Sequence, residues 1–295
     1  MPSRHSAVAV TKRYLSESRF RIRLTDFVNS ELEQTWEAVG GDQLAFSGGA
    51  VIDDRLVRTV VKKAEDATAV LCAIIATGAY WSDYESTRIW VRSIERLANP
   101  TYPTAVNSGY EPRLLPALFV MYAAGIGAVA GDRYEVLRAV LLDPQIRQYE
   151  SESPVVRVLA PTMVLTKLVA SKLADMERHK TPLSAEVQAF LLPLVRPVVP
   201  GEGDYVRTFD RFEYLLSLIN VDVQLQSDKK TVAWVPIGCF GWRASNREAL
   251  DREIERLGQS WPPLKAGLFD GALDRVREAR TYVMQAIHQS GIMFS

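Results

Sequence analysis

The stretch LLPALFVMYAAGIGAVA, Leu114–Ala130, decides the fold of this chain, because seventeen residues without a charge follow one another there. A membrane span needs about 20 predominantly apolar residues. This stretch is shorter, contains one proline and two glycines, and is bounded closely by Arg113 and Asp132. We therefore expect a helix buried in a protein core, in a chain that does not enter a membrane.

The composition of the 295 residues is that of an ordinary globular protein. Lys and Arg number 35, Asp and Glu also number 35, and 47% of the residues are hydrophobic. This mixture excludes a disordered chain, a collagen-like chain and a disulfide scaffold, and it argues against binding nucleic acid through bulk charge. The two cysteines and three histidines lack the spacing of a zinc site. We expect a cytoplasmic protein with no metal and no cofactor.

On both sides of Leu114–Ala130, apolar residues recur at steps of three and four, as they do on one face of a helix. The pattern is clearest between Leu56 and Ile75 and again between Phe209 and Val223. The sequence therefore predicts a mainly α fold, either an irregular helical bundle or a short α-solenoid of about ten helices. Two segments alternate apolar and polar residues instead, and we expect short β-strands near 19–24 and 231–240.

Changes in composition divide the chain into three parts. Residues 1–24 form a basic N-terminal arm, in which six Lys and Arg residues accompany one acid, Glu17. Residues 25–195 form a helical domain. Two prolines and two glycines in 196–204 indicate a linker. Residues 205–295 then form a C-terminal helical subdomain with a short strand, either separate from the first domain or continuous with it.

Two connections between predicted helices resemble each other. GAYWSDYE at Gly78–Glu85 and GAVAGDRYE at Gly127–Glu135 both end one helix with small residues and begin the next with Asp, Tyr and Glu. Small residues allow two helix backbones to approach closely at a tight turn. The pair resembles the helix hairpins of α-solenoids such as tetratricopeptide and HEAT arrays, although such arrays need at least three repeats.

The wider pattern comprises the tryptophan-bearing stretch Arg88–Ala98, the apolar stretch Pro116–Tyr134, and Phe209–Leu218 followed by Trp234–Arg243. It resembles uncharacterised helical regions of bacterial proteins that are found beside nucleotide-binding or phage-defence modules. The resemblance extends over most of residues 20–260. Its motifs are packing motifs, so it implies a place in a bacterial, defence-like assembly and assigns no site residues.

The sequence contains none of the common catalytic signatures. It has no phosphate-binding GxxxxGK[ST] loop, no GxGxxG after a strand and no GxSxG elbow. The leading interpretation is therefore a non-enzymatic helical subunit for protein–protein interaction or regulation. Such a subunit is expected to bind another protein chain or a second copy of itself.

Two alternatives remain open. The first is a defence-associated enzyme in which Asp210, Glu213 and Asp222 hold a metal ion, although a surface ladder of ion pairs explains the same charges. The second is a nucleic-acid-binding accessory protein that uses the basic arm. Arginine beside tryptophan is typical of partner hot spots and of stacking on bases. The candidate binding residues are Arg19, Arg21 and Arg23 in the arm, and Trp242, Arg243 and Arg247 near the C-terminus.

Overall fold

The structure is a computed structural model of the chain, and helices make up 78% of the residues that it describes. This confirms the mainly α prediction. The described part contains ten α-helices of nine or more residues and three of four residues. The structure describes residues 3–40, 44, 52–99, 111–148, 151–173, 180–227 and 231–290.

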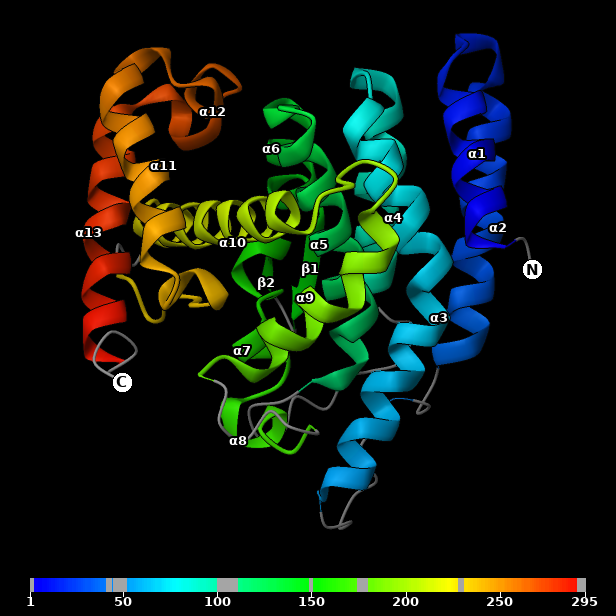
Figure 1. Cartoon of the computed structure of the whole chain (residues 1–295), viewed down its shortest axis with the longest axis horizontal. Helices are drawn as coiled ribbons and strands as arrows, with labels where there is room; N and C mark the ends of the chain where they lie inside the picture. Colours follow the sequence, from blue (N-terminus) through cyan, green and yellow to red (C-terminus); the bar gives the residue numbers. More distant parts are fainter. Residues whose placement is uncertain are drawn as a thin grey trace.

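The first six helices form three consecutive hairpins, which lie side by side in Figure 1. Helices α1, α3 and α5 contact one another in order, and α2, α4 and α6 form a second layer in the same order. This is the arrangement of a short α-solenoid, and three hairpins reach the number that such an array needs. The hairpins are α1 (Arg4–Leu15) with α2 (Arg21–Val39), α3 (Asp54–Trp81) with α4 (Tyr84–Ala98), and α5 (Leu115–Ala130) with α6 (Tyr134–Leu142).

Helix α5 lies at the centre of the molecule. Every residue from Leu115 to Val129 is buried, as the uncharged sequence predicted. The segment Pro112–Ala130 has the length and mean hydropathy, 1.7, of a candidate membrane span, and 89% of it is buried inside the protein. Glycine allows α5 to pack closely on α3, because a Cβ at Gly127 would lie 2.2 Å from the carbonyl oxygen of Ala76.

The second half of the chain covers the layer formed by α3 and α5. Helix α9 packs on both of these helices, and α10 crosses α5 and is flanked by α11 and α13 (Figure 1). One cluster of buried hydrophobic side chains runs from α1 to α13, across the predicted linker at 196–204. These helices are α9 (Pro182–Val195), α10 (Glu202–Leu225), α11 (Ala244–Leu257) and α13 (Leu273–Gln289), with short turns α7 (Pro161–Val164), α8 (Lys167–Ala170) and α12 (Pro262–Lys265) between them.

The prediction of a strand near 19–24 is wrong. These residues form the end of a 3-10 turn, Ser18–Phe20, and the beginning of α2. The alternating stretch is short, and its apolar residue Ile22 is 75% exposed. Leu24 instead begins a helical stripe of buried side chains with Val28 and Leu32, and this longer repeat determines the structure.

The prediction of a strand near 231–240 is also wrong. Residues 231–238 form no strand, and Cys239–Gly241 is a 3-10 turn. The side-chain amide of Gln224 takes the place of a neighbouring strand. Its Nε2 donates to the carbonyl of Trp234 at 2.8 Å, and its Oε1 accepts the N–H of Ala233 at 2.9 Å.

The described residues form one small antiparallel hairpin elsewhere, between β1 (Gln145–Gln148) and β2 (Ser151–Pro154). Ile146 lies opposite Ser153 in its register. The strands are four residues long and mostly polar, so the hydrophobic pattern gives little sign of them. The hairpin contacts the C-terminal half of α4, where Asn99 donates to the carbonyl of Gln145 at 2.7 Å.

Candidate functional site

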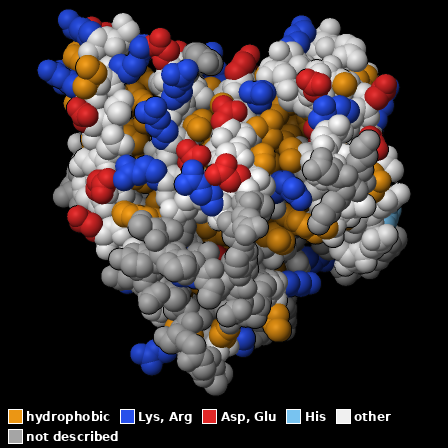
Figure 2. All heavy atoms as spheres, turned by 180° about the vertical axis from the view of Figure 1, so that it is seen from behind, with side chains coloured by type: hydrophobic (Ala, Val, Ile, Leu, Met, Phe, Trp, Pro, Cys, Tyr) orange, Lys and Arg blue, Asp and Glu red, His pale blue; other side chains and the backbone are white. Residues whose placement is uncertain are grey.

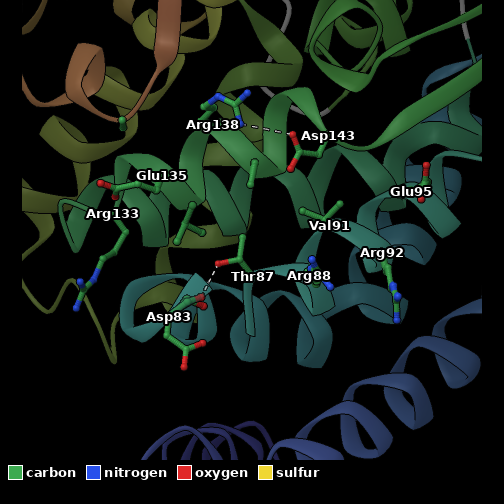
Figure 3. Close-up of a pocket in the computed structure, with 14 residues that line it drawn as sticks. Asp83, Thr87, Arg88, Val91, Arg92, Glu95, Arg133, Glu135, Arg138 and Asp143 are labelled. Carbon is green, nitrogen blue, oxygen red and sulfur yellow. Dashed lines mark hydrogen bonds and ion pairs between the residues drawn. The ribbon is translucent and has the colours of Figure 1, made fainter. Parts of the chain in front are cut away.

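The second helices of two neighbouring hairpins, α4 and α6, are separated by a groove of about 750 Å³, here called the α4–α6 groove (Figure 3). The two similar turns of the sequence lie at one end of it. Ser82 and Asp83 line the groove from the first turn, and Arg133 and Glu135 line it from the second. The repeated turn therefore builds the groove, because it places α4 and α6 side by side.

The floor of the α4–α6 groove is mainly apolar and its two rims are charged. Val136 is buried, and Val91 and Ala139 are half-buried, so apolar surface remains open between the helices. Figure 3 shows Arg92 and Arg133 extending away from the ribbon near opposite ends of the groove. The charged side chains of the rims are Asp83, Arg88, Arg92 and Glu95 from α4 and its cap, and Arg133, Glu135, Arg138 and Asp143 from α6 and its ends.

Most acids of these rims already have partners. Asp83 caps α4 and accepts the Ser86 N–H at 2.8 Å, and this hydrogen bonding with Ser86 holds its pKa below the usual value. Glu95 accepts the N–H of Gln145 at 3.3 Å, and Asp143 lies 3.8 Å from Arg138. Within the described part of the chain, Arg92 and Arg133 make no ion pair. The groove therefore offers guanidinium groups to a ligand.

A second, smaller groove of about 340 Å³ lies between α2 and α4 in the same layer. Leu32 and Trp36 line it from α2, and the guanidinium group of Arg96 on α4 pairs with Glu33 at 2.6 Å. Seen from behind, the molecule is hollowed between two lobes, with Lys, Arg and acidic side chains around the hollow (Figure 2). The layer of second helices thus combines apolar grooves with charges of both signs.

The three carboxylates predicted as a metal site do not come together. Asp210 and Glu213 are both buried on α10, whereas Asp222 lies about 13 Å further along the helix axis. Asp222 instead accepts two hydrogen bonds from the guanidinium group of Arg275, at 2.8 and 2.7 Å. Among the residues that the structure describes, no group of three His, Cys, Asp or Glu side chains could hold a metal ion.

The residues predicted to bind a partner near the C-terminus mostly face inward. Arg243 donates to Asp210 at 2.7 Å, and its guanidinium group lies 4.4 Å from the ring centroid of Trp242. Arg247 is buried and donates to the carbonyl of Gly241 at 3.0 Å. The two arginines therefore hold the segment before α11 in place, and Trp242, 38% exposed, is the member that reaches the surface.

Glu213 is the centre of a buried polar cluster that joins distant parts of the chain. Its carboxylate accepts hydrogen bonds from the hydroxyl of Tyr122 at 3.1 Å, the hydroxyl of Ser184 at 2.6 Å and the N–H of Cys239 at 2.6 Å. Burial raises the pKa of Glu213 to about 7, although these hydrogen bonds favour the charged form. A Cβ at Gly238 would lie 2.2 Å from the carboxylate, so a larger residue there would displace the Glu213 side chain from its hydrogen bonds.

The sequence pattern indicates Glu213 but not its partners. Tyr122, Ser184 and Cys239 come from α5, α9 and the segment before α11. No local spacing connects these positions with α10, because only the folded chain brings them together. The nearest signal is Gly238, which precedes Cys239 and marks a close approach of the backbone.

The arginines of the N-terminal arm lie at the turn between α1 and α2. Arg21 forms an ion pair with Glu85 at the start of α4. Arg19 and Arg23 instead lie with Arg13 around the ring of Phe20, and we call these four residues the Phe20 corner. Their guanidinium carbons are 4.8, 5.5 and 5.9 Å from the ring centroid, in the order given.

A comparison with known proteins finds no family model, no curated protein and no solved structure that matches the chain. At three places in the described residues, charged or polar side chains come together in a defined geometry. They are the α4–α6 groove, the buried cluster around Glu213 and the Phe20 corner.

Proposed function

We propose that this chain is a non-enzymatic helical subunit that binds a segment of a partner protein in the α4–α6 groove. The observation that supports this function is the apolar floor between charged rims, in the second layer of a three-hairpin solenoid. Solenoids use such surfaces to bind partners. An amphipathic helix can place its apolar face on Val91, Val136 and Ala139 and meet the arginines of the rims with acidic side chains.

The partner is another protein subunit or a second copy of this chain. Arginine is enriched among the residues that dominate binding energy, and Arg92 and Arg133 stand at opposite ends of the groove in Figure 3. The resemblance to helical regions beside phage-defence modules leads us to propose a bacterial, cytoplasmic assembly as the setting.

Partner binding in the α4–α6 groove can be tested by a substitution that covers the apolar floor. Ala139→Arg places a long charged side chain over the apolar floor and should raise the Kd of the partner at least about tenfold, a loss of about 1.4 kcal/mol. Gln285→Arg, at an exposed position on α13, adds the same side chain outside the groove and should leave the Kd unchanged.

The measurement begins with a pull-down of the tagged chain from its native host and continues with the Kd of the purified partner. Light scattering on the purified chain detects self-association. If the partner is a second copy of the chain, the Kd of self-association is measured for the same two variants. The proposal fails if Ala139→Arg binds the partner as tightly as the unmodified chain. It also fails if the purified chain is a monomer and the pull-down recovers no partner protein in a stoichiometric amount.

A second candidate function is nucleic-acid binding at the Phe20 corner. Arg13 and Arg23 place two guanidinium groups beside Phe20 at an exposed corner of a chain with no net charge, which is an arrangement suited to phosphates, whereas Arg19 is paired with Glu17 at 2.6 Å. Two phosphate contacts on single-stranded DNA predict a slope of about −1.4 for log affinity against log salt. Arg23→Ala should weaken binding and make the slope shallower by about 0.7.

Arg21→Ala is the matched control for this second function, because Arg21 is paired with Glu85 rather than gathered at Phe20. Fluorescence anisotropy of a labelled oligonucleotide at several salt concentrations gives both quantities. Binding that does not depend on salt, or equal effects of the two substitutions, would exclude the Phe20 corner as a phosphate site.

A further inference from the structure

One wall of the α4–α6 groove is tied to the second half of the chain at its first residue. The phenol oxygen of Tyr134, where α6 begins, accepts two hydrogen bonds from the guanidinium group of Arg211 on α10, at 2.7 and 3.2 Å. The same group donates to both carboxylate oxygens of Glu253 on α11, at 2.7 and 2.8 Å. The indole N–H of Trp261, directly before α12, donates to Glu253 at 3.0 Å. We call these four residues the Arg211 brace.

The Arg211 brace has a fixed geometry. Tyr134 and Trp261 are buried, and the side chains of Arg211 and Glu253 are 24% and 25% exposed. Two parallel hydrogen bonds between a guanidinium group and a carboxylate fix the orientation of both groups. Helix α6 has only nine residues, and helices of this length depend on tertiary contacts for their stability. The brace therefore fixes the point at which α6 begins.

The far end of the Arg211 brace lies against a strained turn. The ring of Trp261 stacks on the ring of Phe269, with the two centroids 6.3 Å apart. Phe269 and the following Asp270 have φ angles of 55° and 54°, which are unfavourable for residues other than glycine. Such conformations persist only where the surrounding structure holds them, and they gather at functional sites. The strained turn is therefore consistent with a functional role for the brace beside it.

The C-terminal helices also reach the α4–α6 groove directly. Ala266, at the end of α12, lines the groove, and a Cβ at the neighbouring Gly267 would lie 3.4 Å from Nε of Arg138 on α6. The opposite wall is held differently, because Asp83 and Ser86 cap α4 within its own hairpin. The two walls are thus positioned by different parts of the chain, and the width between them depends on the brace.

We propose that Arg211 positions the α6 wall of the α4–α6 groove through Tyr134, so that the C-terminal helices control how closely the groove fits a partner segment. This inference rests on the proposed function. Arg211 does not line the groove, so it acts on binding only through α6. Because coupling between two sites is reciprocal, a partner bound in the groove also stabilises the Arg211 brace.

Tyr134→Phe removes the hydroxyl that joins α6 to the brace and leaves the pair of Arg211 with Glu253 intact. Spin labels measure the result without a partner. The two native cysteines are buried, so labels attach to Arg92→Cys on α4 and Glu135→Cys on α6, both at exposed positions. The distribution of distances between the labels should broaden in Tyr134→Phe, and amide hydrogen exchange in α6 should become at least about tenfold faster. Arg211→Lys, which keeps the charge but loses the paired hydrogen bonds, should have the same effect.

Tyr214→Phe is the matched control. The hydroxyl of Tyr214 is also buried and donates to a carboxylate, that of Asp251, at 2.8 Å, but it joins α10 to α11 instead of α6. This variant should keep the label distances and the exchange of α6. The Kd of the partner purified from the pull-down should rise about tenfold in Tyr134→Phe and stay unchanged in Tyr214→Phe. A purely structural role of the two hydroxyls would change stability in both variants without this difference in Kd.

Label distances that stay the same in Tyr134→Phe, or that change equally in Tyr214→Phe, overturn the inference. It also fails if Ala139→Arg raises the Kd and Tyr134→Phe does not, a result that leaves the proposed function standing. If Ala139→Arg has no effect, the proposed function fails, and the label distances still decide whether Arg211 positions α6. Thermal unfolding of each variant shows that it is folded at the temperature of the measurements.

Discussion

Replacing Gly127 with alanine is expected to lower the free energy of unfolding by about 3 kcal/mol, the upper end of the usual cost of overpacking a core. The added Cβ would lie 2.2 Å from the carbonyl oxygen of Ala76. That oxygen belongs to the backbone of α3, so it cannot rotate away as a side chain could. The two central helices, α3 and α5, must therefore move apart, and their shared core opens with them.

Gly203→Ala is the matched control for this substitution, since it adds the same methyl group to another helix. At Gly203 the nearest neighbour of an added Cβ is the flexible end of Arg207, 3.6 Å away. Alanine is favoured over glycine within helices by up to about 1 kcal/mol, so this variant should be as stable as the unmodified chain or slightly more stable. Urea unfolding followed by circular dichroism measures both. Equal losses at the two positions would contradict the close packing of α5 on α3.

Glu213→Gln is expected to remove a large part of the pH dependence of stability. Burial raises the pKa of Glu213 from 4.5 to about 7, so the folded state binds the proton more tightly than the unfolded state. The stabilising contribution is fully present below pH 4.5 and is lost as the pH rises through about 7. At about 1.4 kcal/mol for each pKa unit, the loss amounts to about 3 kcal/mol.

Glutamine fits the same cluster without a charge. Its amide oxygen can accept the N–H of Cys239, and its amide nitrogen can donate to the hydroxyl oxygens of Tyr122 and Ser184. The variant should therefore fold, and it should be more stable than the unmodified chain at pH 8. Thermal unfolding between pH 5 and pH 8 measures the effect. A pH profile that stays parallel to that of the unmodified chain would show that Glu213 does not titrate in this range.

A second buried carboxyl group contributes to the slope that remains in this variant. Glu65 on α3 also has its pKa raised to about 7, first by burial and then by the neighbouring carboxyl group of Glu186. Its contribution has the same sign as that of Glu213, so Glu213→Gln should flatten the profile without making it level. Glu248→Gln, at an exposed position on α11, should leave the profile unchanged.

Much of the fold could be predicted because its main signals are local. The uncharged run Leu114–Ala130 predicts a buried helix, and the two Gly-containing turns indicate hairpins of one kind. The sequence does not indicate the hairpin of α1 and α2, because a short alternating stretch, Phe20–Leu24, obscures the start of a longer helical repeat. The alternation in residues 231–238 predicts a strand, but the backbone there bonds to a side chain, Gln224, rather than to another strand.

The candidate sites depend on contacts that no local pattern records. Asp210 and Glu213 could be selected because they lie three residues apart on one helix. Their partners come from α5, α9 and the segment near α11, and only the tertiary fold brings these groups together. The similar turns of the sequence indicated repeated hairpins, but the α4–α6 groove depends on how far apart the following helices lie.

The central position of α5 also has a consequence for how the chain is made. On the ribosome, the nascent chain presents α3 before α5, so one side of this apolar helix finds its partner early. Its other side packs on α10, where a Cβ at Gly125 would lie 2.0 Å from the ring of Phe212. At about 5–20 residues per second, translation from residue 130 to residue 225 takes about 5–20 s. During that time the flank of α5 that meets α10 lacks this partner, and the delay becomes longer when elongation is slower.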